Sequence, residues 1–405
     1  GFMAPPRLAI VGGGLAGSLC ALVAHSRGLR PVIFDAGRRT LGGRFAGGHD
    51  PDSGGQFLRA SEASQFMSVL AMLHENGLVS PWNGRFGVLG SRAGGFLPFD
   101  TLRKSAMLAK PEDLDTGGDF CGFLSTSAAA TYVGVPSNAS VCSGICNAIG
   151  AEVRTGVQVT AARLSQNGWR LEASGARDET FDAVILATHD PSLAAATVRS
   201  LQPHTADGSD HSARLGDLAD ALQKQRNQQR APVFTLSARY PRGSLSSVVP
   251  FDAACVPGES HISFISRYAS KPGREDKPHE ELWSAVSTTY FAAELLRAAS
   301  SRTQEEVETA AAEALDLELR RLCRGYFGGD DSAVPRALEV RAKRWGAGFA
   351  ARTLGLNEDA ICLEPWRLAI CGDFVRDHPS PVESAARSGL AAGERVAAFF
   401  SSPAD

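Results

Sequence analysis

The first 35 residues constrain most tightly what this chain can fold into. An apolar run over residues 8–11 ends in the pattern Gly12-Gly-Gly14-Leu-Ala-Gly17, and an alanine- and leucine-rich stretch follows. A second apolar run over residues 31–34 leads to Asp35, 23 residues after Gly12. This order predicts a buried strand, a tight turn, a helix, a second strand and an acid. That is the dinucleotide-binding pattern in its proper setting.

Each residue type has a separate role in this pattern. Gly12 permits the sharp turn, Gly14 lets the backbone approach a pyrophosphate, and Gly17 lets the helix pack closely on the strand. The N-terminus of the helix offers free N–H groups and a partial positive charge to the phosphates. Asp35 is expected to accept hydrogen bonds from ribose hydroxyls. The alternative is an ordinary glycine-rich turn between a strand and a helix.

A basic segment with a second glycine pair follows the acid. It reads Asp35-Ala-Gly-Arg38-Arg-Thr-Leu-Gly42-Gly43-Arg44. Two glycines and an arginine would let backbone and guanidinium close on a diphosphate from the other side. A dehydrogenase that binds only a nicotinamide nucleotide does not need this second clamp. The alternative is a basic surface loop.

Two further segments have the composition of walls around a flat ring. In residues 52–57 a glycine pair precedes a glutamine and a phenylalanine, and in residues 343–349 a tryptophan stands beside glycines. Glycines allow the chain to approach a planar group closely. The residues predicted to act at the ring, as walls or orienters, are Gln56, Phe57, Trp345 and Phe349.

The C-terminal region predicts an apolar strand that ends in Gly372-Asp373, then a loop and a helix. Ser380 is the expected N-cap, Pro381 fits the first helical position, and Glu383 is expected to complete a capping box. Asp373 would bond a ribityl hydroxyl, and the N–H groups at Val382-Glu383 would face negative charge on a reduced flavin. The alternative is a plain capped helix.

The middle of the chain predicts a second domain. A strand near Val157 is expected to flank the adenine half of the cofactor, and an apolar strand over 181–188 is expected to be central. Three further strands are predicted at 233–240, 246–251 and 261–268, and a loop at 202–214. Helices are predicted at 60–75, 280–299 and 304–323. A capping box at Thr303 is expected to begin the last of these helices. Strands without intervening helices favour a separate antiparallel sheet.

The predicted fold class is therefore α/β, with a Rossmann-like dinucleotide-binding domain and a second domain of mixed sheet plus helices. The family resemblance given below implies that the first is an FAD-binding domain and that the second binds substrate. We expect a discontinuous first domain over residues 1–80, 132–192 and 335–405. The second domain is expected over residues 81–131 and 193–334.

Composition excludes several other classes. The 405 residues carry a formal net charge of −3, which argues against a nucleic-acid partner. No apolar run reaches the ~20 residues of a membrane span. The eight cysteines form no C-x-x-C pair and the nine histidines no H-x-x-x-H pair, so no metal site is expected. We expect a soluble intracellular protein, cytoplasmic, or organellar if a transit peptide has been removed. Monomer and homodimer stay open.

Taken together, these motifs resemble the flavin amine oxidase superfamily, and within it the renalase-like oxidoreductases. The narrower resemblance rests on residues 52–57 and 132–136, on Ala187-Thr188, on residues 266–274 and on Arg344-Trp345. It implies FAD in a two-domain fold, with a small substrate that is oxidised and oxygen as the acceptor. Covalent attachment in some relatives uses a cysteine before the last strand; Cys362 and Cys371 do not match that motif, so non-covalent FAD is expected.

The resemblance also implies a substrate class, a small amine or a dihydronicotinamide such as NAD(P)H or an isomer. Two alternatives remain: a flavin-dependent desaturase or isomerase of a larger apolar substrate, and a non-catalytic flavin-binding module. The residues expected to bind the cofactor are Gly12, Gly14, Leu15, Ala16, Gly17, Asp35, Ala36, Arg38, Gly42, Gly43, Arg44, Gly55, Gln56, Phe57, Val157, Gly372, Asp373, Val382, Glu383 and Ala385.

Overall fold

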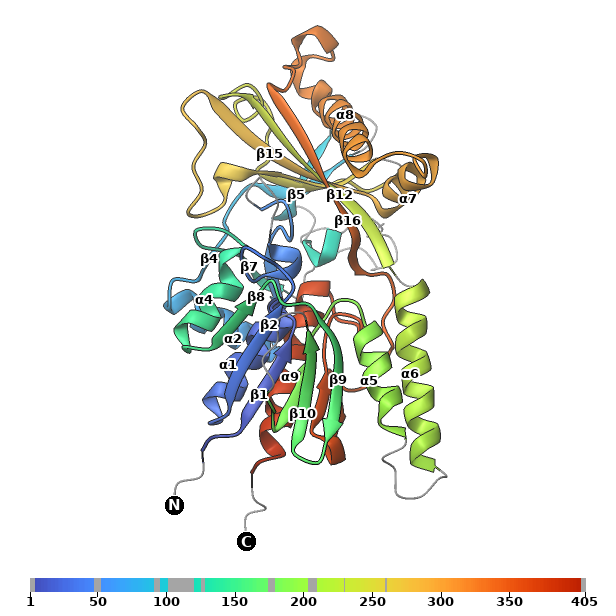
Figure 1. Cartoon of the computed structure of the whole chain (residues 1–405). Helices are drawn as coiled ribbons and strands as arrows, with labels where there is room; N and C mark the ends of the chain where they lie inside the picture. The colour runs from blue at the N-terminus through green and yellow to red at the C-terminus, as the bar shows by residue number, and fades with distance from the viewer. Residues whose placement is uncertain are drawn as a thin grey trace.

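A six-stranded sheet is built on the predicted strand-turn-helix-strand unit (Figure 1). Five of its strands are parallel, and β17 pairs antiparallel to β18 at one edge. Its order is β17 (Ile361–Leu363), β18 (Leu368–Ile370), β11 (Ala183–Leu186), β1 (Arg7–Val11), β2 (Arg30–Asp35) and β8 (Glu152–Thr155). Strand β11 is buried throughout, as its apolar sequence predicts for a central parallel strand. The Rossmann-like fold is confirmed.

Helices cover both faces of this sheet. The helices α1 (Leu15–Ser26), α2 (Gln65–Glu75), α4 (Ser140–Ala148) and α9 (Pro381–Ala398) share one hydrophobic cluster. On the opposite face lie α5 (Ser192–Ser200), α6 (Asp210–Gln228) and the hairpin of β9 (Val159–Ser165) with β10 (Gly168–Ala173). The first helix is therefore enclosed by the end of the chain, and the two termini lie at the same end of the molecule (Figure 1).

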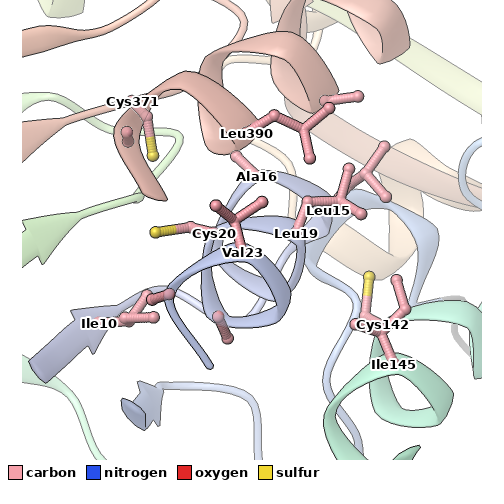
Figure 2. Close-up of a cluster of buried hydrophobic side chains, with 14 of the residues drawn as sticks. Ile10, Leu15, Ala16, Leu19, Cys20, Val23, Cys142, Ile145, Cys371 and Leu390 are labelled. Atoms are coloured by element: carbon pink, nitrogen blue, oxygen red, sulfur yellow. The ribbon is translucent and has the colours of Figure 1, made fainter. Parts of the chain in front are cut away.

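Close packing of α1 on α9 depends on small residues. Figure 2 shows Ala16 and Cys20 on the side of α1 near Cys371 and Leu390, whereas Cys142 of α4 lies on another side. A Cβ added at Gly389 would overlap the backbone of Ala16. The two helix backbones approach one another this closely because glycine leaves the space free.

The seven-stranded sheet forms the other end of the molecule, with α7 (Thr289–Ala298) and α8 (Gln304–Cys323) on one face (Figure 1). Its order is β16 (Glu339–Ala350), β12 (Arg230–Pro241), β15 (Glu280–Ser287), β14 (Ile262–Arg267), β13 (Ala253–Cys255), β5 (Phe86–Leu89) and β6 (Phe96–Pro98). Along β12, Phe234 and Leu236 pack toward the helices, whereas Val233 belongs to an aromatic cluster on the other face. This alternation gives the sheet one helix-covered face and one face toward the first domain.

A three-stranded sheet of β3 (Leu58–Ser61), β7 (Ala128–Gly134) and β4 (Val79–Pro81) completes the described structure. The structure describes residues 4–46, 52–90, 95–100, 120–124, 128–173, 179–202, 210–228, 230–258 and 261–401.

Several element predictions are wrong, each for a local reason. Residues 280–287 form the central strand β15 rather than a helix, because β12 and β14 pair with both of its edges and its side chains are buried on both faces. Only α7 is helical in this stretch. The predicted strand at 246–251 is a turn, and the predicted helix at 60–75 begins at Gln65 with Ser64 as its N-cap. Helix α6 begins at Asp210 inside the predicted loop, of which residues 203–209 lie outside the described residues. The capping box at Thr303 is confirmed.

The packing suggests domain boundaries that differ from the expected ones. Leu215, Ala219 and Leu222 of α6 pack in the cluster beneath the six-stranded sheet. Strand β16 pairs with β12 along the edge of the seven-stranded sheet. We therefore propose that residues 193–202 and 210–228 belong to the first domain and that the second domain extends to about Ala350.

Candidate functional site

A cavity of about 1110 Å³ lies between the two large sheets. Residues of the glycine-rich turn after β1 line one part of it, and Val233, Thr235 and Val286 of the seven-stranded sheet line another. This volume is slightly above the usual range of roughly 300–1,000 Å³ for small-molecule pockets, so the cavity has room for a large ligand. Because its walls come from both sheets, the cavity joins a nucleotide-type turn to a separate apolar pocket.

The glycine-rich turn has the geometry that its spacing predicts. Gly12 has φ of 110°, and a Cβ there would lie 2.6 Å from the carbonyl oxygen of Ala187. A Cβ at Gly17 would overlap the backbone of Gly12, so helix and strand touch at this point. Gly14 lines the cavity, and a Cβ there would meet no atom within 4 Å. The backbone at Gly14, at the N-terminus of α1, is therefore open to a ligand, whereas Gly17 acts through packing.

Asp35 lies at the end of β2 and lines the cavity. Its two carboxylate oxygens accept hydrogen bonds from the backbone N–H groups of Gly13 and Gly37, each at 2.7 Å. The acid therefore fixes the glycine turn as well as facing the cavity. Arg38 is exposed and does not line the cavity.

Arg44 and Asp373 form a bidentate ion pair on the cavity wall. The two guanidinium nitrogens of Arg44 donate to the carboxylate of Asp373 at 2.7 and 2.8 Å, and one also donates to the carbonyl of Gly348 at 3.1 Å. Burial raises the pKa of Asp373, but the charge and hydrogen bonds of Arg44 outweigh it and leave this pKa below its usual value. The pair joins the second glycine segment to the end of β18 and to β16.

Gln56 lines the cavity, but its amide is fully engaged by the protein. Its Nε2 donates to the carbonyls of Asp52 and Gly54 at 2.7 and 2.8 Å. Its Oε1 accepts from Ser266 and Lys271, both at 3.2 Å. All four hydrogen-bonding positions of this amide are therefore used. The geometry supports a role in holding the 52–57 loop rather than a free amide beside a ring.

A buried ionic network fixes the same loop. Asp52 has φ of 54° and accepts from Arg274 at 2.8 Å and from the backbone N–H of Asn138 at 2.9 Å. Arg274 also donates to the carbonyl of Gly134 at 2.5 Å. The ammonium group of Lys271 lies 3.9 Å from Asp52, and burial lowers the pKa of Lys271 to about 8. Three segments far apart in the sequence, each part of the resemblance, thus meet at one point.

Aromatic side chains form another part of the cavity wall, with Phe57, Phe120, Trp345 and Phe349 among its lining residues. Phe57 contacts the rings of Phe120 and Phe264 with centroids 6.2 and 5.7 Å apart. The indole N–H of Trp345 donates to the carbonyl of Ser53 at 2.9 Å. Phe349 also lines the cavity. The four residues predicted to act at the ring therefore all border one space, although Gln56 has no unused polar group.

The C-terminal helix presents its first turn to the cavity through Val382 and Ala385. Ser380 is its N-cap, and its hydroxyl accepts from the N–H of Glu383 at 3.0 Å. The predicted capping box is wrong, because the carboxylate of Glu383 instead accepts from the N–H and hydroxyl of Ser61 at 3.2 and 3.0 Å. Glu383 is buried and does not line the cavity, so it ties α9 to β3.

Most of the residues predicted to bind a cofactor line this one cavity, and Gly17, Arg38 and Glu383 do not. The lining residues among them are Gly12, Gly14, Leu15, Ala16, Asp35, Ala36, Gly42, Gly43, Arg44, Gly55, Gln56, Phe57, Val157, Gly372, Asp373, Val382 and Ala385. Sequence reasoning missed three further lining residues, Val233, Thr235 and Val286. Val233 and Thr235 alternate with Phe234 along a strand that was predicted, so alternation could have found them. Val286 lies in β15, which was mistaken for a helix and is buried almost throughout, so it had no such signal.

Comparison with known proteins shows two kinds of similarity. A family model matches the N-terminal part of the chain, and solved structures are similar to the fold over nearly its whole length. Residues 10–71 match the model of the NAD(P)-binding Rossmann-like domain. No curated protein matches the chain. An oxidoreductase from Methanosarcina mazei superposes with a TM-score of 0.64 at 15% identity, over 96% of this chain and 100% of that one. Cyclohexylamine oxidase from Brevibacterium oxydans gives 0.60 at 14%, over 97% and 99%.

A putrescine oxidase bound to putrescine gives a TM-score of 0.61 at 15% identity, over 97% of this chain and 99% of that one. The chain has the fold of these oxidases. In the described part of the chain, no helix combines the length and apolarity needed to cross a membrane.

Proposed function

We propose that this protein is an FAD-dependent oxidoreductase that takes a hydride from a small substrate onto non-covalently bound FAD. The observation that carries the proposal is the continuity of the cavity from the open backbone at Gly14 to the aromatic wall at Phe57 and Trp345. A diphosphate suits the first part, because helix N–H groups and dipole favour anions. A flat ring suits the second, because aromatic and glycine residues border it.

The residues at the cavity fit FAD from end to end. Asp35 and Val157 border the part expected to hold the adenosine, and Arg44 lies beside the glycine turn. Asp373 and the first turn of α9 border the part expected to hold the ring. Bound FAD would supply a ring that accepts a hydride, and the protein would supply orientation and a water-poor pocket. None of the cysteines is proposed to attach it covalently.

We further propose a renalase-like substrate, a dihydronicotinamide or an amine, with oxygen as the final acceptor. The same buried network that unites residues 52–57, 132–136 and 266–274 supports this finer assignment, because these are the segments of the narrower resemblance. The amine is supported by the fold shared with putrescine and cyclohexylamine oxidases. Trp345 and Phe349 would orient the substrate against the ring.

A second candidate is a flavin-dependent desaturase or isomerase of a larger apolar substrate. The apolar side chains of Val233, Val286 and Phe120 on the far wall favour it. Hydrogen peroxide formation during steady-state turnover separates the two, since an oxidase forms it in proportion to substrate consumed.

The decisive experiment is the visible spectrum of the purified protein with added FAD, followed by anaerobic addition of dihydronicotinamide isomers and of amines. We expect bound flavin whose absorbance bleaches with a dihydronicotinamide. A flavoprotein that none of these compounds bleaches would overturn the substrate assignment alone. A protein that takes up no FAD would overturn the proposed function.

A further inference from the structure

The charges around the cavity divide unevenly between its two ends. Three carboxylates line it, those of Asp35, Asp190 and Asp373, and all stand at the ends of the six-stranded sheet or just beyond. Lys343 and Arg344 line it from β16 of the seven-stranded sheet. Among the described lining residues that come from the seven-stranded sheet, no side chain is acidic. The end of the cavity proposed to take substrate is therefore apolar with a cationic edge.

The three carboxylates already have partners. Asp35 accepts from two backbone N–H groups, and Asp373 holds Arg44. Asp190 accepts from Ser192 and lies 3.4 Å from Arg226. A substrate ammonium group would have to compete with these interactions to find a counter-ion. The described walls thus give a cationic substrate little to bind.

Lys343 differs from these groups because its ammonium has no carboxylate within 4.0 Å among the described residues. It lies over the ring of Trp345, 4.4 Å from the centroid, so the residue predicted as a wall carries a cation on its face. Burial lowers the pKa of Lys343, and the nearby Glu308 opposes this. Glu308 is itself held by Gln304 at 3.0 Å and by the N–H of Arg344 at 2.9 Å.

A half-buried ammonium without a carboxylate partner gains when an anion binds beside it, since the charged form is then favoured. The neighbouring apolar surface of Val233, Val286 and Phe349 suits a hydrocarbon or aromatic body. An anion on such a body would satisfy both features at once. Because the ammonium group of Lys343 is half-buried, its charge-assisted hydrogen bond to a bound anion would be stronger than the same bond at an open surface.

We propose that Lys343 is a specificity-determining residue that binds the carboxylate or phosphate of a planar, largely apolar substrate, and that the site therefore selects anionic over cationic substrates. This rests on the proposed function, and it favours a dihydronicotinamide that carries phosphate over a simple amine. Arg344 pairs with Phe234, whose side chain packs toward the helices, whereas Lys343 pairs with Thr235 at the cavity, so the role is assigned to Lys343 alone.

Calorimetric titration of the FAD-treated protein tests this with four probes that share one ring: benzoate, phenyl phosphate, benzamide and benzylamine. We expect the anions to bind at least about tenfold more tightly than benzylamine. Comparison of benzoate with phenyl phosphate identifies which anion the site prefers. Equal or tighter binding of benzylamine would overturn the proposal.

Variants assign the effect to one residue. Lys343→Gln should weaken binding of the preferred anion about tenfold and change benzamide binding less than about twofold, whereas Lys343→Arg should retain the anion. Lys277→Gln is the matched control, because Lys277 is an exposed, ion-paired lysine of the same domain. Unchanged anion binding in Lys343→Gln would overturn the proposal. Calorimetry reports probe binding even if FAD is not taken up, so failure of the proposed function is seen separately.

Discussion

At the scale of single residues, the buried carboxylate of Asp52 depends on Arg274. Both side chains are fully buried, and removal of Arg274 leaves the carboxylate of Asp52 with a weaker partner, the Lys271 ammonium 3.9 Å away. We expect Arg274→Met to lower the free energy of unfolding by about 3–5 kcal/mol, or to prevent folding. Arg297→Met, which breaks an exposed pair on α7, should cost less than about 1 kcal/mol. Urea unfolding of both variants measures this, and equal midpoints would contradict it.

Lys271 gives the protein a specific pH dependence. Its pKa is about 8 in the folded protein against 10.5 for an ordinary lysine, since burial disfavours the ammonium. Between these pH values the unfolded chain keeps a proton that the folded protein has lost, so this group makes stability rise with pH. Below pH 8 both states are protonated and the penalty is constant.

The variant Lys271→Met removes this titration and keeps all other titrating groups. Their contributions to the pH dependence therefore cancel when the unfolding free energies of the two proteins are subtracted. The unfolding free energy of the unmodified protein minus that of Lys271→Met should rise by up to about 1.4 kcal/mol per pH unit from pH 8 to 10. Urea unfolding at three pH values measures it. A difference that stays flat, or that falls with pH, would show that Lys271 is not the buried ammonium described.

At this scale the sequence could predict local backbone requirements but not the partners of buried side chains. The spacing of Gly12, Gly14 and Gly17 predicts the turn because each position has a local backbone requirement. The partners of Gln56 could not be predicted, since Ser266 and Lys271 lie more than 200 residues away. A glutamine beside a glycine pair suggests a free amide as readily as an engaged one.

At the scale of elements, the contact between α1 and α9 depends on Gly389. Gly389→Val should destabilise the protein by about 2 kcal/mol or more and weaken FAD binding, because a side chain there would push α9 away from Ala16. Ala398→Val, on an exposed position of the same helix, should change little. Thermal unfolding and FAD titration of both variants measure this. Equal behaviour of the two variants would contradict the packing.

Strand β15 shows where reasoning about elements failed. Trp283 and Val286 are spaced as in a helix, which is why a helix was predicted. In the structure the segment pairs with β12 and β14 at its two edges, and its side chains are buried on both faces. A fully buried strand has no alternation to reveal it. The helices whose first residue follows an N-cap residue, Thr303 or Ser380, were predicted at the correct position.

At the scale of the whole molecule, the two domains are joined where the cavity forms. Arg44 bonds to the backbone of β16, Trp345 bonds to Ser53, and Arg274 bonds to Asp52. Each of these contacts joins segments more than 200 residues apart. The position of the site at a domain junction follows from the fold class, whereas the apolar and cationic character of its second half required the structure.

FAD should therefore stabilise the whole molecule rather than one domain. A ligand that binds only the folded state at 100 times its Kd adds about 2.7 kcal/mol, which raises Tm. Gly14→Val should abolish this rise, because its side chain would occupy the open space at the helix N-terminus. A Cβ there meets no protein atom within 4 Å, so we expect little change in the Tm of the FAD-free protein.

Gly95→Val is the matched control, since Gly95 also has no atom within 4 Å of an added Cβ and does not line the cavity. It should keep the full FAD-dependent rise. Differential scanning calorimetry with and without FAD measures all three proteins. An undiminished rise in Gly14→Val would show that FAD does not bind at the glycine turn. A rise lost in both variants would instead indicate general damage to the fold.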